Sequence, residues 1–361
     1  MTIPAVLKFG GSTFPDVEAY ADLAQALRRR IEEDGRPLAV VASGMPGETE
    51  KLRGRLHEAD PQPEDATVAG LLTLADTVSA HLLAAALHRA GVAATVLAGH
   101  QQGLVTDSTF MWAKVERSDA EPLRRAFEEH QVVIVPGGQA ADAQGRPTWL
   151  GKNSSDLSAV LVAAALGIDR VEIHSDVDGI YSADPNVVAD ARLIPEITYD
   201  TAALMSLYGA KVLHRRSVRT AQQHGITLIC RHNKAPFASG TVISAEGAPA
   251  TGVVANTRSR VLAYATETDA DRAHSVFHNE GVDTVRLEDG PHLAVVGGYL
   301  DIDHFQQVHQ LPPARDMGVL VAEITGSRAT THIAADADQA RALARKLHAD
   351  LPAPAPKLHA L

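Results

Sequence analysis

The residues best suited to chemistry follow the first predicted strand. Residues 5–9 alternate like a strand, and Gly10-Gly11-Ser12-Thr13 comes directly before a helix pattern that opens at Pro15-Asp16. A glycine turn between a strand and a helix start brings backbone N–H groups together, where they can bind a phosphate. Lys8 would point into the same site. The pattern is neither a P-loop nor a dinucleotide fingerprint, so a plain tight turn remains the alternative.

Several other predicted strand ends lead into loops of small or polar residues. These loops are residues 43–49, 136–139 and 175–179, and a further polar loop, 150–156, precedes an Ala-rich helix pattern. In open α/β sheets, ligands bind at the carboxyl ends of strands, so loops of this kind together predict one shared cleft. The stretch 149–185 contains a polar turn, a helix, a strand and an acidic turn, which is half of a βαβ unit. Ordinary surface turns are the alternative.

Some kinds of chemistry are not supported by the motifs. The acidic turn 175–179 lacks the further ligands and the glutamate that an EF-hand loop needs. The histidines show neither HExxH nor paired-cysteine spacing, so no fixed transition-metal site is expected. The chain also has no G-x-S-x-G elbow, which removes the simplest serine-hydrolase interpretation.

The elements that would hold these loops alternate between strand and helix. Strand patterns occur at 38–42, 95–98, 132–135, 171–174 and 227–230. A long amphipathic helix is predicted over 68–90, with Asp76 in its first half; the alternative for Asp76 is an ordinary solvated side chain. Alternating βα units predict an α/β fold with a mostly parallel sheet covered by helices on both faces.

Composition is typical of an ordinary globular protein. The 361 residues are 45% hydrophobic and 21% charged, and the length suggests two to three domains. We expect no membrane-spanning run and no secretory signal, since the N-terminus reaches a strand-like segment without a basic region. The single cysteine, Cys230, fits a reducing cytoplasm. A net charge of −11 without a basic run argues against nucleic acid as the main partner.

Seven motifs together resemble the aspartate kinases of the amino-acid kinase superfamily. They occur in the family's order, over roughly residues 3–245: KFGGS at 8–12, the loop 43–49, LADTVSA at 74–80, TDS at 106–108, LGKNSSD at 150–156, SDVDGIYSADP at 175–185 and YGAKVLH at 208–214. The resemblance implies an αβα sandwich that transfers the γ-phosphoryl group of ATP to a side-chain carboxylate. A carboxylate is already ionised at neutral pH, so this reaction needs positive charge and alignment rather than a general base.

The resemblance also implies roles for individual residues. Lys8 and Lys211 would flank the transferred phosphoryl group, and Asp156 would hold those lysines in place. The amides of Gly10 and Gly11 would donate to the phosphates, and Mg²⁺ would arrive with the ATP. Other nucleotide-binding positions are Ser12, Ser175, Asp176, Tyr181, Asn186 and Gly209. The acceptor-binding positions are Ser43, Thr49, Asp76, Lys152, Asn153, Ser154 and Ser155.

The departures from the family pattern concentrate at the acceptor end. Lys152 stands where the family usually has an arginine that binds the amino acid's carboxylate. The lysine keeps the positive charge but cannot form the bidentate contact. Asn153 and Ser154 replace two glycines, and Asp76 is one methylene shorter than the family's glutamate. At the nucleotide end, Asn186 stands where the family often has arginine, and Arg215 stands where proline often follows Leu-His.

The order of the predicted elements changes after about residue 253. Patterns at 261–267, 269–280, 282–287 and 292–299 give β-α-β-β, and a comparable set follows at 303–310, 318–325, 329–334 and 336–350. Two such units resemble the paired ACT domains of aspartate kinases; a small domain kept for dimerisation is the alternative. We therefore predict a catalytic domain over 1–246, a tandem ACT-like domain over 253–351 and a disordered tail over 352–361.

These observations predict an ATP-dependent kinase that forms an acyl phosphate on L-aspartate or a close analogue. Two alternatives stay open: a kinase with a changed small anionic acceptor, and an inactive homologue that binds nucleotide or effector. The expected partners are a small amino-acid substrate, an amino-acid effector at the ACT-like domain and a second copy of the chain in a homodimer, with no nucleic acid or membrane.

Overall fold

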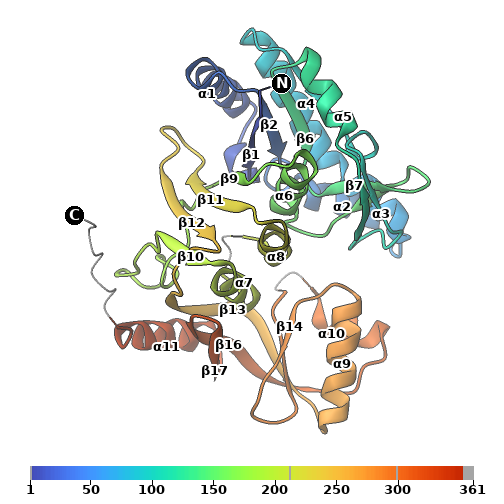
Figure 1. Cartoon of the computed structure of the whole chain (residues 1–361). Helices are drawn as coiled ribbons and strands as arrows, with labels where there is room; N and C mark the ends of the chain where they lie inside the picture. The colour runs from blue at the N-terminus through green and yellow to red at the C-terminus, as the bar shows by residue number, and fades with distance from the viewer. Residues whose placement is uncertain (1, 211–212, 298–299, 353–361) are drawn as a thin grey trace. The chain divides into compact units, whose positions relative to one another are not determined.

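The computed structural model describes residues 2–210, 213–297 and 300–352, which are organised in two units (Figure 1). The first unit contains most of the chain up to Gly247. The second contains the described residues from Ala248 onward, together with Tyr181–Ile194 and Leu204–Ala210. Nothing in the sequence pattern indicated that these two short segments join the second unit. Lys211, the second predicted catalytic lysine, lies outside the described residues, as do residues 353–361 of the predicted tail.

The first unit is built on an eight-stranded sheet. Its strands lie in the order β10 (Glu196–Thr198), β12 (Ser239–Ser244), β11 (Thr227–His232), β9 (Arg170–Ser175), β1 (Ala5–Phe9), β2 (Leu38–Ala42), β6 (Val132–Pro136) and β3 (Ala94–Val96). All neighbours are parallel except β11 and β12. The central strands are buried on both faces, as their runs of Val, Ile and Leu require. The predicted α/β fold with a mostly parallel sheet is confirmed.

Helices cover both faces of this sheet. On one face α1 (Glu18–Asp34) and α4 (Leu74–Arg89) pack on β1, β2 and β6, where Leu7, Phe9, Leu27 and Leu83 form a core. On the other face lies α6 (Ser155–Leu166), which contacts β1, β2 and β9. Since side chains alternate along a strand, Lys8 points to the α6 face while Leu7 and Phe9 point to the α1 face. The remaining helices of the unit are α2 (Glu48–Ala59), α3 (Asp65–Leu72), α5 (Glu121–Glu129), α8 (Arg215–His224) and the first part of α7 (Tyr199–Tyr208).

The long helix predicted over 68–90 is interrupted at Thr73, which separates α3 from α4. The Thr73 hydroxyl donates back to the carbonyl of Gly70 at 3.1 Å, and a threonine that bonds to its own helix competes with regular helix geometry. Contrary to our expectation, residues Asp65–Arg89 together are apolar and long enough to cross a membrane. Half of that apolar window is buried in the fold, and Leu83 and Leu87 belong to the core, as in a core helix of a globular domain.

A smaller four-stranded sheet also belongs to the first unit, in the order β5 (Val115–Ser118), β4 (Leu104–Thr106), β7 (Gln139–Asp142) and β8 (Pro147–Trp149). β7 and β8 form an antiparallel pair that leads from the glycine turn after β6 to the predicted acceptor loop. This sheet thereby fixes the position at which the acceptor loop begins, at residue 150.

The second unit has a five-stranded sheet in the order β14 (Thr284–Arg286), β15 (His292–Val295), β13 (Thr251–Ala263), β16 (Arg315–Thr325) and β17 (Arg328–Ala334). Its neighbours are all antiparallel. β13 begins ten residues before the strand predicted at 261 and ends at Ala263 instead of 267. Because β13 pairs with β15 and with β16, the strands of the two predicted modules lie in one sheet.

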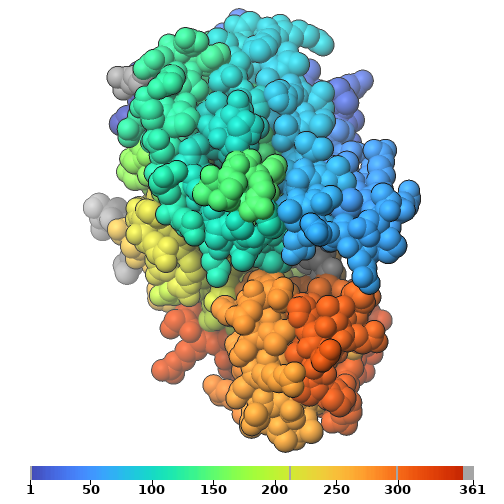
Figure 2. Space-filling model, turned by 90° about the vertical axis from the view of Figure 1, so that its right-hand side faces the viewer, coloured from blue at the N-terminus to red at the C-terminus, as the bar shows by residue number. Residues whose placement is uncertain are grey.

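The helices that follow β13 in the described part of the chain are α9 (Glu267–Asn279), α10 (Ile302–Val308) and α11 (Ala337–Ala349). α9 and α10 lie side by side (Figures 1 and 2). The rings of Phe277 and Phe305 stack between them, with centroids 4.5 Å apart. α11 packs on β13 and β16 through Ala340 and Ala344. Within its described residues, the second unit thus has one hydrophobic cluster around Leu262 and Phe277 and another around Val253 and Ala340.

Candidate functional site

The candidate site lies where loops follow the carboxyl ends of β1, β2 and β9 and where α6 begins. Lys8 and Asp156 meet there: Lys8 Nζ is 2.7 Å from Asp156 Oδ1, and the side chains are 10% and 8% exposed. The second oxygen of Asp156 accepts a hydrogen bond from the His214 N–H at 3.2 Å. A buried charge is costly unless it has a partner of opposite charge, and here each group is the partner of the other.

The glycine turn after β1 presents fewer amides than the sequence predicted. The N–H of Gly10 donates to the His174 carbonyl at 3.1 Å, as part of the pairing between β1 and β9. It is therefore not available to a phosphate, and that part of the prediction is wrong. Gly11 and Ser12 begin a 3₁₀ helix, and the first N–H groups of a helix have no partner within it. These two amides remain for an anion beside the Lys8 ammonium.

The turn after β1 is pressed against the loop after β2. A Cβ placed on Gly11 would lie 2.7 Å from the Gly44 carbonyl oxygen, so only glycine fits. Ser43, in the second loop, shares a hydrogen bond with Ser155 at the start of α6, 2.7 Å between the hydroxyl oxygens. Two predicted acceptor positions, Ser43 and Ser155, therefore lie beside the glycine turn. Thr49 is half-buried in the first turn of α2.

Asp76, on the first turn of α4, holds the loop after β2. Its Oδ1 accepts the Gly44 N–H at 2.8 Å. Burial raises the pKa of Asp76 to about 7, against the opposing effects of the Gly44 hydrogen bond and the positive charge of Lys8. The alternative of an ordinary solvated aspartate is therefore wrong, and this carboxyl titrates near neutral pH.

The acceptor loop at 150–155 has an unusual backbone. Gly151 has φ 106°, and a Cβ there would lie 2.6 Å from the Trp112 ring; Asn153 has φ 60°. The buried Ser154 hydroxyl donates to the Gly151 carbonyl and closes the turn. Lys152 Nζ donates to Glu50 Oε1 of α2 at 3.0 Å, and this hydrogen bond lowers the pKa of Glu50. Lys152, which is predicted to bind the substrate, is thus held by Glu50, an acidic residue that the sequence motifs did not indicate.

Asn233 forms hydrogen bonds both to the loop after β9 and to the glycine turn after β1. The Asn233 N–H donates to the Ser175 carbonyl at 2.8 Å, and its side-chain amide donates to the hydroxyls of Ser12 and Thr13, each at 3.2 Å. Ser175 itself accepts the Val177 N–H, which closes a turn. Asp176 is exposed. No sequence signal pointed to Asn233, because it follows β11 in a loop without a recognisable motif.

The remaining predicted nucleotide positions belong to the second unit. Tyr181 pairs with Leu193 in an isolated bridge. Asn186 donates to Asp184 Oδ1 from both its main chain and its side chain, at 2.9 and 3.1 Å. Gly209 has φ 110°, and a Cβ there would lie 2.5 Å from the Asn256 amide nitrogen. The structure therefore places these three within the second unit, whereas the other predicted residues that it describes lie in the first.

A buried charge cluster on β9 supports the site from the α1 face of the sheet. Glu172 lies 2.9 Å from an Arg30 nitrogen and 2.8 Å from an Arg231 nitrogen. Burial by itself raises the pKa of Glu172, but the hydrogen bonds from His174 and Arg30 and the charge of Arg231 outweigh it and bring the pKa to about 2. His174 stacks on Phe9 at 4.4 Å. Motif reasoning missed this cluster, which fixes the strands that carry Lys8 and Ser175.

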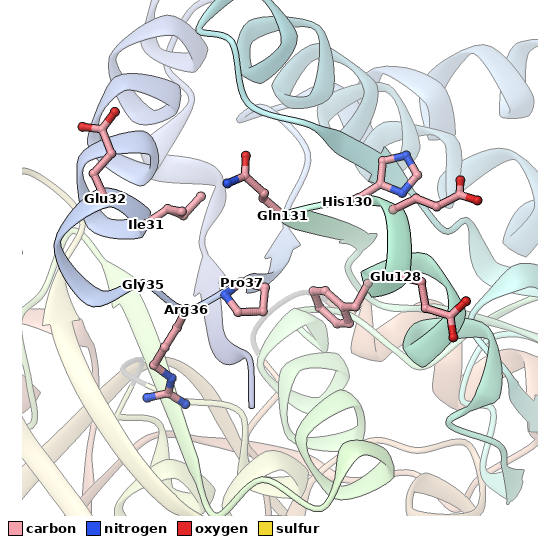
Figure 3. A pocket seen from close by; sticks show the side chains of 10 residues that line it. Ile31, Glu32, Gly35, Arg36, Pro37, Glu128, His130 and Gln131 are labelled. Atoms are coloured by element: carbon pink, nitrogen blue, oxygen red, sulfur yellow. The ribbon is translucent and has the colours of Figure 1, made fainter. Parts of the chain in front are cut away.

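A hollow of about 480 Å³ lies at the opposite end of the sheet, between the end of α1 and the end of α5 (Figure 3). Its lining includes Ile31, Arg36, Pro37 and His130. These residues precede β2 and β6, whereas the site loops follow the strands. None of the predicted site residues lines this hollow.

Comparison with known proteins points to one family. The model of the amino acid kinase family matches residues 4–232. An aspartokinase of Helicobacter pylori is 35% identical over 241 residues, which are 67% of this chain and 59% of that protein. An aspartokinase of Thermus thermophilus is 34% identical over 63% of this chain and 56% of that protein. The chain spans a little under three fifths of the length of these relatives.

Solved structures share the fold. E. coli aspartokinase III in complex with aspartate and ADP superposes with a TM-score of 0.67 at 22% identity, covering 89% of this chain and 87% of that one. Aspartate kinase from Synechocystis gives 0.59 at 26% identity, covering 90% and 60%. With the family model matched from the first strand through β11, and with the fold and loop geometry described above, the chain belongs to the amino acid kinase family.

Proposed function

We propose that this protein is an ATP-dependent kinase that phosphorylates the side-chain carboxylate of L-aspartate or a close analogue. The observation that carries the proposal is the buried pair of Lys8 and Asp156, at the point where the glycine turn, the loop after β2 and the start of α6 meet. The relatives named above, all aspartokinases, support the same reaction.

In the proposed reaction, an oxygen of the acceptor carboxylate forms a bond to the γ-phosphorus, the bond to the β-phosphate oxygen breaks, and ADP leaves. The acceptor is ionised at neutral pH, so no general base is needed. Lys8 stabilises negative charge on the transferred group, and the Gly11 and Ser12 amides donate to phosphate oxygens. Asp156 keeps the Lys8 ammonium in one position. Lys211 is proposed as the second cation on the basis of its motif.

The proposed nucleotide contacts are Ser175, Asp176, Tyr181, Asn186 and Gly209. Gly10 leaves room for Lys8, since a Cβ at Gly10 would lie 3.2 Å from Lys8 Nζ. Mg²⁺ is proposed to arrive with ATP. Among residues 2–210, 213–297 and 300–352, no group of three or more His, Cys, Asp or Glu side chains is placed to hold a metal ion. Phosphate oxygens would then supply most of the ligands, as is usual for Mg²⁺.

The proposed acceptor site comprises Ser43, Thr49, Asp76 and the loop Lys152–Ser155. Two observations favour a changed acceptor as the second candidate function. Lys152 is hydrogen-bonded to Glu50, and Asp76 is bonded to the Gly44 amide. Both groups that would bind an α-amino acid therefore already have protein partners. An inactive homologue is disfavoured by the intact pairing of Lys8 with Asp156.

The second unit is proposed to act as an ACT-like module that binds an amino-acid effector and joins two copies of the chain in a cytoplasmic homodimer. One solved relative, E. coli aspartokinase III, is described in complex with lysine and aspartate. Sedimentation of a shortened chain ending at Ser244 tests the dimer. A dimer that persists without the second unit contradicts this part of the proposal.

The test of the reaction is ATP turnover with hydroxylamine trapping across aspartate, glutamate and their hydroxylated or extended relatives. Hydroxamate from aspartate at ordinary rates supports aspartate kinase activity. Hydroxamate from another acid alone supports the changed acceptor. ATP binding without turnover on any acid contradicts the proposed function.

A further inference from the structure

The segment Tyr181–Ile194 follows the loop after β9 and carries two of the proposed nucleotide contacts, Tyr181 and Asn186. It is a folded part of the second unit. The Ser182 N–H donates to the Arg192 carbonyl at 2.8 Å, and the Arg192 N–H donates to the Ser182 hydroxyl oxygen at 2.9 Å. The two ends of the segment are therefore held together at Ser182.

Ser182 is also the point at which this segment joins the sheet of the second unit and its last helix. Its carbonyl accepts the Val253 N–H of β13 at 2.7 Å. Its hydroxyl lies 2.8 Å from Nε2 of His348, on the last turn of α11. Ser182 is 4% exposed and His348 is 3% exposed. We assign the hydroxyl proton to this bond, because the Ser182 oxygen already accepts the Arg192 N–H.

Further contacts join the segment to α11 and to the chain that follows this helix. Arg345 of α11 donates to the Val187 carbonyl at 3.4 Å, and Arg192 donates to the Pro352 carbonyl at 3.3 Å. The Val187 side chain packs against the hydrophobic cluster that contains Ala340 and Ala344 of α11. The segment is thus held by α11 at its beginning and middle, and near its end by Pro352, which follows that helix.

The arrangement of Ser182, His348 and Asp190 is not that of a hydrolase site. Asp190 lies 3.7 Å from Nδ1 of His348 and is 82% exposed, so it does not orient the ring as a buried carboxylate would. Ser182 is buried and its oxygen is engaged by the Arg192 amide, so no substrate reaches it. The bond between Ser182 and His348 therefore has a structural role in this segment.

We propose that His348 is a positioning residue for nucleotide binding, which acts through Ser182 by holding the segment Tyr181–Ile194 against α11. The inference rests on the proposed function, in which Tyr181 and Asn186 contact ATP. It implies that the C-terminal helix, which is remote in sequence from the phosphate motifs, sets the affinity for the nucleotide. A buried hydrogen bond is suited to this role, since it fixes one arrangement of the chain.

The test compares ATP binding and turnover in the full-length protein and in His348→Ala. We expect the Kd and KM for ATP to rise about tenfold, with kcat and the KM for the acceptor changed less than twofold, because one buried bond that orders a binding segment is lost. Hydrogen exchange of backbone amides in residues 181–194 should become faster in the same variant. His348→Gln, which can still bond to the Ser182 hydroxyl, should restore the ATP affinity.

His332→Ala is the matched control, because His332 is a half-buried histidine of the same unit that bonds to Glu323 instead of the segment. If His348→Ala does not fold, Ser182→Ala removes the same bond from the other side. An unchanged ATP affinity in a folded variant overturns the inference, as does an equal loss for ATP and the acceptor. ATP binding can be measured without an acceptor substrate, so it tests the role of His348 even if no acceptor is phosphorylated. The failure of this inference can therefore be distinguished from the failure of the proposed reaction.

Discussion

Lys8 Nζ lies 2.7 Å from Asp156 Oδ1, and the two side chains expose 10% and 8% of their surface. The pair links the middle of the sheet to the first turn of α6, next to the glycine turn. Replacing Lys8 by methionine removes the charge at the proposed phosphoryl site and also leaves Asp156 buried without its partner.

For Lys8→Met we expect kcat to fall by about 10³-fold, as for other preorganised charges. We also expect the free energy of unfolding to fall by about 3–5 kcal/mol, because a carboxylate loses its buried partner. Lys8→Met/Asp156→Leu should regain most of that stability but no turnover. Urea unfolding and steady-state kinetics measure the two effects. Lys51→Met, at an exposed pair with Glu48, is the control and should cost no more than about 1 kcal/mol. Ordinary turnover in Lys8→Met would exclude the proposed role.

Asp76→Asn tests the carboxyl whose pKa is raised to about 7 from the value of 3.8 for a free aspartate. A raised pKa means that the fold favours the neutral form. The contribution of this group to the free energy of unfolding is therefore complete below pH 3.8 and is lost as the pH rises through 7. Asparagine stays neutral and can still accept the Gly44 N–H, so the variant should gain stability relative to the natural protein between pH 4 and 7. Urea unfolding across that range measures the difference; a constant difference would contradict the prediction.

Glu172→Gln tests the cluster with Arg30 and Arg231. The pKa of Glu172 is lowered to about 2 from 4.5, so its contribution to stability is complete above pH 4.5 and is lost as the pH falls toward 2. The variant should lack this acid dependence and should be less stable at pH 7 by about 3–5 kcal/mol, since two arginines lose their carboxylate. Chemical unfolding between pH 3 and 7 checks this. Glu32→Gln, at an exposed pair with Arg28, should change neither property.

Glu50→Gln tests the acceptor loop. Removing the charge of Glu50 should leave Lys152 more attractive to the carboxylate of the acceptor, so the KM for aspartate should fall by up to about fivefold, the scale of an exposed ion pair. The KM for ATP should not change. Glu58→Gln makes the same chemical change on an exposed position of α2 and serves as the control. A higher KM for aspartate in Glu50→Gln would show that Glu50 helps to bind the acceptor instead of competing for Lys152.

The sequence by itself determined the fold class and the strand ends that carry the site. The alternation of residues 5–9, the apolar runs at 38–42 and 132–135, and the glycine turn at 10–11 are local signals. A strand followed by a helix start has the same geometry wherever it occurs, so these elements could be placed without knowing their neighbours. The apolar pattern also located the helix of residues 68–90, although not its interruption at Thr73.

The tertiary structure decided which side chains meet. Asp76 could be a solvated carboxylate until the Gly44 amide was placed beside it, and Glu50 had no visible role until α2 lay next to the acceptor loop. Glu172 reads as an ordinary polar residue within a strand, yet it is buried between two arginines. These pairings depend on strand order, register and helix placement. Periodicity indicates which face of an element is buried, but it does not identify the residue that will lie opposite, and burial next to a particular partner is what sets the charge and the hydrogen bonds of each group.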